Sequence, residues 1–116
     1  MNRIEPNIQE FKSEKDLEDR MDLILYALND TVTPIPEAGT ICTFKYFAKT
    51  PKLKYDQHPL VAVSDILPWG FRGINFHLRD YRQYTWAELG SQVYVVQQEE
   101  LDDLMSLNYK KVVLNR

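Results

Sequence analysis

The chain has 116 residues, of which 44% are hydrophobic and 27% charged, and its formal net charge at pH 7 is −3. This composition excludes a disordered chain, because enough apolar surface is present to offset the entropy lost on ordering. The length suits one hydrophobic core, so we expect residues 1–116 to form a single domain. No long apolar run occurs, so we expect neither secretion by a signal peptide nor a membrane span.

Charge is distributed unevenly along the chain. Residues 1–37 contain four basic and nine acidic residues, a net charge of −5, whereas residues 38–87 contain seven basic and three acidic residues, a net charge of +4. Residues 88–116 carry a net charge of −2. The middle segment also holds ten of the fourteen aromatic residues, so we expect it to contain the functional core.

The first predicted element is an amphipathic helix over residues 14–29. Ser13 can cap its first amide groups, and acidic residues follow at the positive end of the helix dipole. Apolar side chains then recur at helical spacing, at Leu17, Met21, Ile24, Leu25 and Leu28. The next stretch, residues 29–39, contains two prolines and predicts an extended linker.

From residue 40 the pattern changes to the alternation of β-strands, with Phe44 and Tyr46 on the same face as Cys42. Cys42 is the only cysteine, so it cannot form an internal disulfide, and its apolar surroundings favour a buried, unreactive thiol. Further elements follow in chain order. We predict strands at 40–47, 59–66, 72–78, 93–96 and 112–114, a helix from Asp80 through Glu88, and helical turns near 101–105.

Five short strands joined by tight turns predict an α+β protein. A small SH3-like β-barrel is our first expectation for its architecture, and a twisted antiparallel sheet is the second. In both, residues 1–37 form an N-terminal amphipathic helix and linker, and residues 38–116 form a β-rich core.

The most distinctive motif lies between Tyr55 and Leu78. It consists of Tyr55-Asp56, Pro59-Leu60-Val61, Gly70-Phe71, Gly73, Asn75 and His77. The pattern resembles a motif of small proteins of contractile-tailed bacteriophages, although Leu78, Arg79 and Asp80 stand where that pattern has a tyrosine and then Leu-Pro. The resemblance implies a protein of the host cytoplasm or the virion, whose partners are other phage proteins, further copies of itself, or DNA.

The same motif also has a purely structural interpretation. Gly70 and Gly73 permit a positive φ, or a close approach of two backbones, around a turn and a bulge. Two glycines at this spacing are not a phosphate-binding loop, because nucleotide-binding fingerprints need more glycines or a following Gly-Lys-Ser/Thr.

The leading functional hypothesis is a non-enzymatic interaction or assembly module. In it, apolar side chains of the N-terminal helix and of the turn near residue 70 contact a partner protein. The residues expected to do so are Leu17, Met21, Ile24, Leu28, Trp69 and Phe71.

The alternative is a DNA-contacting accessory protein, for example one that acts at genome ends. Lysine and arginine side chains would bind phosphates, and an aromatic ring would stack on a base. The candidate residues are Lys49, Lys52, Lys54, Tyr55, Arg72, Arg79 and Arg82.

Catalytic and metal-binding patterns are not evident in the sequence. His58 and His77 are the only histidines, and neither stands in a helical pair or beside a cysteine. We therefore expect no enzyme activity, no cofactor and no metal. A small metal-dependent nuclease is a third interpretation, and it requires carboxylates that converge on a cation with a lysine nearby; four carboxylates are candidates. These are Asp56, Asp65, Asp80 and Glu88.

Overall fold

The computed structural model describes residues 2–47, 54–56, 59–90, 92–107 and 111–113. For residues 54–56 and 111–113 it describes the backbone path alone. The elements in chain order are η1 (Glu5–Asn7), α1 (Ile8–Ser13), α2 (Leu17–Ala27), η2 (Asn29–Thr31), β1 (Val32–Thr33), β2 (Ile41–Thr43), β3 (Lys54–Asp56), β4 (Leu60–Leu67), β5 (Gly70–Asn75), β6 (Asp80–Thr85), α3 (Trp86–Leu89), β7 (Val93–Val96), η3 (Gln98–Glu100), α4 (Leu101–Met105) and β8 (Lys111–Val113).

The protein is α+β, and its main feature is a six-stranded antiparallel sheet in the order β1-β7-β2-β4-β5-β6. Strands β3 and β8 pair separately as a two-stranded antiparallel sheet. The outer strands β1 and β6 do not pair with each other, so the six-stranded sheet is not closed. The expected SH3-like barrel is therefore wrong. One physical reason is that β1 has two residues and is followed by Pro34 and Pro36, which have no amide hydrogen to extend a ladder.

Two helices, α1 and α2, precede the sheet where the sequence predicted one. Ser13 is the last residue of α1, and its hydroxyl donates to the carbonyl of Gln9 (2.7 Å). The cap of α2 is Asp16, whose carboxylate accepts from the backbone amides of Glu18 and Asp19 (2.9 and 3.0 Å). The assignment of Ser13 as the cap is thus wrong, because a carboxylate three residues later satisfies those amides.

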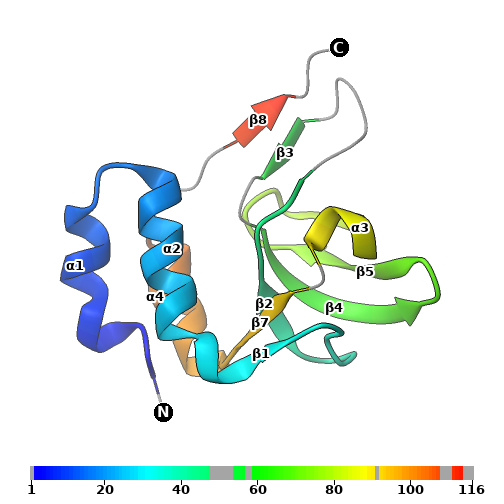
Figure 1. Cartoon of the computed structure of the whole chain (residues 1–116), viewed down its shortest axis with the longest axis horizontal. Coiled ribbons are helices and arrows are strands. Elements are labelled where there is room, and N and C mark those ends of the chain that lie inside the picture. Colours follow the sequence, from blue (N-terminus) through cyan, green and yellow to red (C-terminus); the bar gives the residue numbers. More distant parts are fainter. Residues whose placement is uncertain (1, 48–53, 57–58, 91, 108–110, 114–116) are drawn as a thin grey trace.

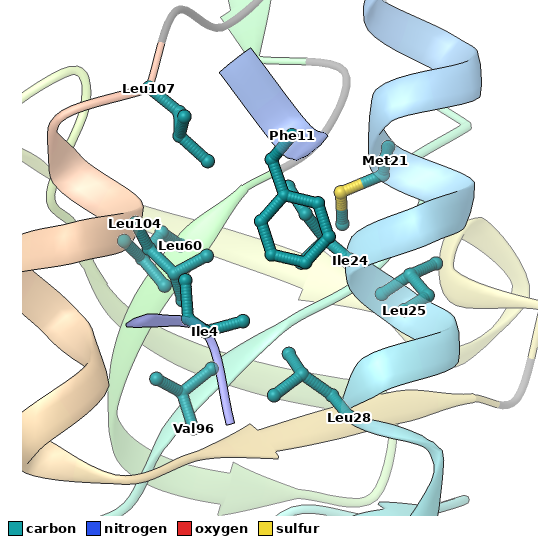
Figure 2. Close-up of a cluster of buried hydrophobic side chains, with 10 residues drawn as sticks. All are labelled: Ile4, Phe11, Met21, Ile24, Leu25, Leu28, Leu60, Val96, Leu104 and Leu107. Atoms are coloured by element: carbon teal, nitrogen blue, oxygen red, sulfur yellow. The ribbon is translucent and has the colours of Figure 1, made fainter. Parts of the chain in front are cut away.

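A first hydrophobic cluster joins the helices to one face of the sheet (Figure 2). It draws on segments far apart in the sequence, so the N-terminal helices and the C-terminal helix α4 pack in one core beside the sheet (Figure 1). Its buried members are Ile4, Phe11, Met21, Ile24, Leu25, Leu28, Leu60, Val96, Leu104 and Leu107.

A second cluster lies on the other face of the sheet and is rich in aromatic side chains. The ring of Tyr84 lies 5.2 Å from that of Phe44 and 5.0 Å from that of Tyr46, in edge-to-face geometry that adds to the gain from burial. Cys42 is buried here, as expected, and desolvation raises the pKa of its thiol far above the usual range. The remaining members are Val61, Val63, Phe71, Leu89 and Val93.

The helix predicted from Asp80 through Glu88 is wrong. Residues 80–85 form β6, because all six residues pair antiparallel with β5, and this pairing places Tyr84 opposite Phe71 in the second cluster. A short helix, α3, begins only at Trp86, after a capping box in which Thr85 donates from its amide and its hydroxyl to the Glu88 carboxylate (3.1 and 2.8 Å).

Gly70 and Gly73 are needed because neighbouring backbone lies too close to either residue for a side chain to fit. A Cβ on Gly70 would lie 1.9 Å from the carbonyl oxygen of Tyr84, and one on Gly73 would lie 2.3 Å from that of Ala62. Neither glycine has a positive φ, which among the described residues occurs at Gly39, Gly90 and Arg79. The bulge near this site is in β4, between Val63 and Asp65.

A buried ion pair ties the N-terminal segment to the C-terminal one. Arg3 donates from Nε and Nη2 to the two carboxylate oxygens of Glu100 (2.9 and 2.8 Å), and its backbone amide donates to the same carboxylate (2.7 Å). The guanidinium also donates to Asp30 (2.7 Å), to Thr31 (2.8 Å) and to the carbonyl of Val95 (3.0 Å). One side chain thereby links the N-terminal segment with η2, β7 and η3.

The first stability prediction concerns the two kinds of glycine. Gly73→Val is expected to cost about 3 kcal/mol or more, because its Cβ would meet backbone that cannot move aside. Gly39→Ala is expected to cost only about 1–2 kcal/mol, since it strains a φ of +87° in open space. Urea unfolding of both variants measures the difference, and equal losses would contradict the close-approach explanation.

The second stability prediction concerns the buried carboxylate of Glu100. Burial acts to raise its pKa, but hydrogen bonds from Arg3 and from the amide of Gln97 outweigh burial and lower it. A lowered pKa stabilises the fold above the unfolded value of about 4.3, and the gain is lost as pH falls through the folded value. Glu100→Gln should therefore lose about 3 kcal/mol at pH 7, with a shallower acid-induced decline than the wild type.

Asp30→Asn is the matched control for Glu100→Gln, because it removes the exposed partner of the same arginine. Urea unfolding at pH 7 and at acid pH should show a smaller loss for this variant. Equal losses would show that burial of Glu100 is unimportant.

Candidate functional site

Most residues expected to contact a partner are covered by the chain itself. Met21, Ile24 and Leu28 are buried in the first cluster (Figure 2), and Leu17 is half-buried. Phe71 is fully buried in the second cluster, whereas Trp69 is exposed in the turn between β4 and β5. In this conformation, the apolar face of α2 packs on its own protein.

The structure does not gather the arginines of the DNA hypothesis on one surface. Arg72 pairs with Asp65 (3.3 Å) and Arg82 pairs with Asp80 (2.9 Å). Arg82 lies directly opposite Gly73, the neighbour of Arg72, so Arg72 and Arg82 point to opposite faces of the sheet. Arg79 is exposed in the turn before β6.

The remaining residues of the DNA hypothesis lie outside the described residues or in β3. Lys49 and Lys52 lie outside the described residues. Lys54 and Tyr55 belong to β3, where they pair with Val113 and Val112 of β8.

Three of the carboxylates required by the nuclease hypothesis have separate tasks. Asp65 accepts from Tyr81 (3.0 Å), and this hydrogen bond is the main cause that lowers its pKa. Asp80 pairs with Arg82, and Glu88 caps α3. Within the described ranges, no three His, Cys, Asp or Glu residues lie close enough together to hold a metal ion. Asp56 is in β3, and His58 lies outside these ranges.

Asn75, part of the phage-like motif, has a structural task. Its side chain is buried, donates to the Tyr84 hydroxyl (3.1 Å) and accepts from the amide of Leu78 (2.9 Å). It therefore fixes the turn between β5 and β6 while anchoring Tyr84 in the second cluster.

An open groove of about 470 Å³ lies between α2, the segment after β2, the end of α3, and β7. We call it the α2 groove. Leu25 and Leu89, buried members of the first and second clusters, line it, so it lies where the two cores meet. Tyr26 and Phe47 flank it and are 85% and 59% exposed.

The polar contacts of the α2 groove fix its two sides. Lys45 and Asp22, both lining residues, form an ion pair (2.5 Å) between the two sides. The amide of Phe47 donates to the carbonyl of Glu88 (2.9 Å), which holds the segment after β2 against α3. The two exposed rings are thus carried by α2 and by a segment that contacts both α2 and α3.

The sequence contained a signal for this groove that the periodicity analysis did not use. Tyr26 stands four residues after Asp22, on the polar face of α2. Phe47 breaks the alternation that places Phe44 and Tyr46 inside. Large aromatic side chains on faces otherwise assigned to solvent indicate a contact surface.

None of the helices described is long and apolar enough to cross a membrane.

Comparisons with known proteins do not assign the chain to a family. No family model matches it, and no significantly similar curated protein or solved structure is found. The proposals that follow rest on residues, contacts and charges.

Introducing a charge into the first cluster tests whether the apolar face of α2 is needed for folding of the isolated protein or only for contact with a partner. Met21→Asp is expected to destabilise the isolated protein by about 3 kcal/mol or more, because the new carboxylate has no partner in the core. Tyr26→Asp, on the same helix but exposed, should change stability little. Thermal unfolding of both checks this, and wild-type stability of the Met21 variant would contradict the packing.

Proposed function

We propose that this protein is a non-enzymatic interaction and assembly module of a contractile-tailed phage. The motif between Tyr55 and His77 supports the phage context through its resemblance to small phage proteins. The proposed partners are other phage proteins or further copies of the chain.

The α2 groove carries this proposal. Two large aromatic side chains, Tyr26 and Phe47, are held in solvent on either side of a partly apolar depression. Exposing them in the free protein has a cost in hydration, and aromatic residues are enriched where proteins meet. The groove therefore supports binding of a protein surface.

The described contacts favour this function over the two alternatives. Arg72 and Arg82, which a DNA-binding face would use, are already paired with aspartates and face opposite ways. Asp65, Asp80 and Glu88, which a nuclease would use, hold strands and a helix cap. To bind DNA or a metal ion, these arginines or carboxylates would have to lose the contacts that they make within the fold.

A single triple variant distinguishes assembly from DNA contact. Replacing Lys49, Lys52 and Lys54 by alanine should leave incorporation into particles nearly intact, because the proposed contact uses Tyr26 and Phe47, and lysines outside the centre of an interface affect association rate more than binding energy. If the protein instead binds DNA through these lysines, the log-affinity versus log-salt slope should fall by roughly two to three units.

Particle incorporation is measured by quantifying the chain in purified mature particles. A defined multiple copy number supports the assembly module. Loss of the protein from particles, together with a reduced salt slope on DNA, would replace it with the DNA-contacting alternative.

A further inference from the structure

The two edges of the six-stranded sheet differ in how well they are protected against pairing with another strand. At one edge, β1 has two residues and is followed by Pro34 and Pro36. At the other edge, β6 has six residues, and each of them pairs with a residue of β5 without a bulge. Its two charged residues, Asp80 and Arg82, pair with each other (2.9 Å). β6 therefore lacks the proline, the bulge and the unpaired charge that protect edge strands.

The hydrogen bonds near the end of β6 show which of its backbone groups face outward. The amide of Trp86 donates to the carbonyl of Trp69 (3.2 Å), so the alternation of an antiparallel ladder makes the even-numbered residues of β6 bond to β5. The amide of Thr85 agrees with this, because it donates to the carboxylate that caps α3 (3.1 Å). Tyr81 and Gln83 thus direct an amide and a carbonyl each away from the sheet, and no described residue bonds to these four groups.

The aromatic side chain beside this edge leaves the backbone uncovered. The hydroxyl of Tyr81 donates to the carboxylate of Asp65 (3.0 Å) and lies 2.7 Å from the hydroxyl of Ser64, so the ring leans across β5 toward β4. Ile74 lies directly opposite Tyr81 on β5, and the two side chains are 49% and 51% exposed. The open edge therefore borders an exposed apolar surface.

We propose that β6 pairs antiparallel with β6 of a second copy of this chain, so that two six-stranded sheets join into one. A two-fold axis at Arg82 places Tyr81 of each copy opposite Gln83 of the other, and all four outward backbone groups of each strand are then bonded. The contact is isologous, since both copies use the same surface. The inference goes beyond the proposed function, because β6 does not line the α2 groove.

Charge and length favour a second copy as the strand that binds here. Asp80 and Arg82 lie two residues apart on one face of β6, so antiparallel self-pairing places each Arg82 diagonal to Asp80 of the other copy. The four side chains form a neutral cluster in which each arginine lies near two aspartates. The open stretch ends where the amide of Thr85 is already bonded and where Arg79 turns the chain (φ +56°). The open edge of one copy therefore matches that of the other in length and in charge.

Proline substitutions distinguish the outward amides of β6 from the inward ones. Gln83→Pro removes an amide that does not bond to β5, so this variant should fold while its self-association weakens at least about tenfold. Arg82→Pro removes an amide that bonds to β5 and should lower the melting temperature strongly. Gln83→Ala keeps the amide, and as the matched control it should associate like the wild type. Analytical ultracentrifugation measures the association, and thermal unfolding measures the melting temperature.

Cysteine pairs provide a second measurement that does not depend on proline. Cys42 is the only native cysteine and is buried, so new surface thiols react first. A mixture of Tyr81→Cys and Gln83→Cys should form a disulfide between copies with oxidised glutathione, because directly paired residues lie about 5.5 Å apart at Cα. Each variant alone should react less, since its two thiols are diagonal, about 7–8 Å apart. Tyr26→Cys, mixed with Gln83→Cys, is the exposed control and should give background cross-linking.

Three results would overturn the inference. These are a monomeric wild type at concentrations on the order of 100 μM, self-association that Gln83→Pro leaves unchanged, and a mixture of Tyr81→Cys and Gln83→Cys that cross-links no more than the Tyr26→Cys control. Particle incorporation is scored separately. A chain that enters particles in multiple copies while remaining monomeric in solution would refute the β6 contact and leave the proposed function standing.

Discussion

The buried pair of Arg3 and Glu100 is the constraint on which the rest of the structure depends. Glu100 is fully buried, and a carboxylate in that position is tolerated only while a cation and amide donors surround it. Arg3 supplies the cation and also binds Asp30, Thr31 and the carbonyl of Val95. The N-terminal helices cannot leave the sheet without exposing both charges to solvent or stranding one of them. The position of α2, and with it one side of the α2 groove, is therefore held by an interaction directly after the C-terminal end of the helix.

The second constraint is the aromatic cluster on the other face of the sheet. Phe44, Phe71 and Tyr84 meet edge to face or tilted, and Gly70 and Gly73 let neighbouring strands approach closely enough for this packing. The segment after β2 is held by this cluster through Tyr46, whose hydroxyl donates to the buried Glu88 (3.2 Å). Phe47 follows directly and is carried outward. The two sides of the α2 groove thus belong to different cores, and the groove lies where these cores meet.

The periodicity of the sequence predicted the structural features that depend on residues close together in the chain. The helical repeat identified Met21, Ile24, Leu25 and Leu28, which are all buried, and the apolar run near residue 60 identified β4. The helix expected from residue 80 was wrong because Tyr84 packs on partners in the segment after β2 and on β5, which no short window contains. The barrel was wrong because closure depends on whether two distant edges meet. The Arg3–Glu100 pair joins residues 97 positions apart, and the α2 groove joins Tyr26 to Phe47, so the periodicity of a single helix or strand predicts neither contact.

The sequence separation of that ion pair has a consequence for biosynthesis. During translation Arg3 and the apolar face of α2 leave the ribosome well before Glu100, Leu104 and Leu107. At the usual 5–20 residues per second, the interval between Arg3 and Glu100 lasts roughly 5–20 s. For that time the first hydrophobic cluster lacks part of its cover and the arginine lacks its buried partner. A chaperone that binds emerging apolar helices therefore has a binding site on α2 until α4 arrives to cover it.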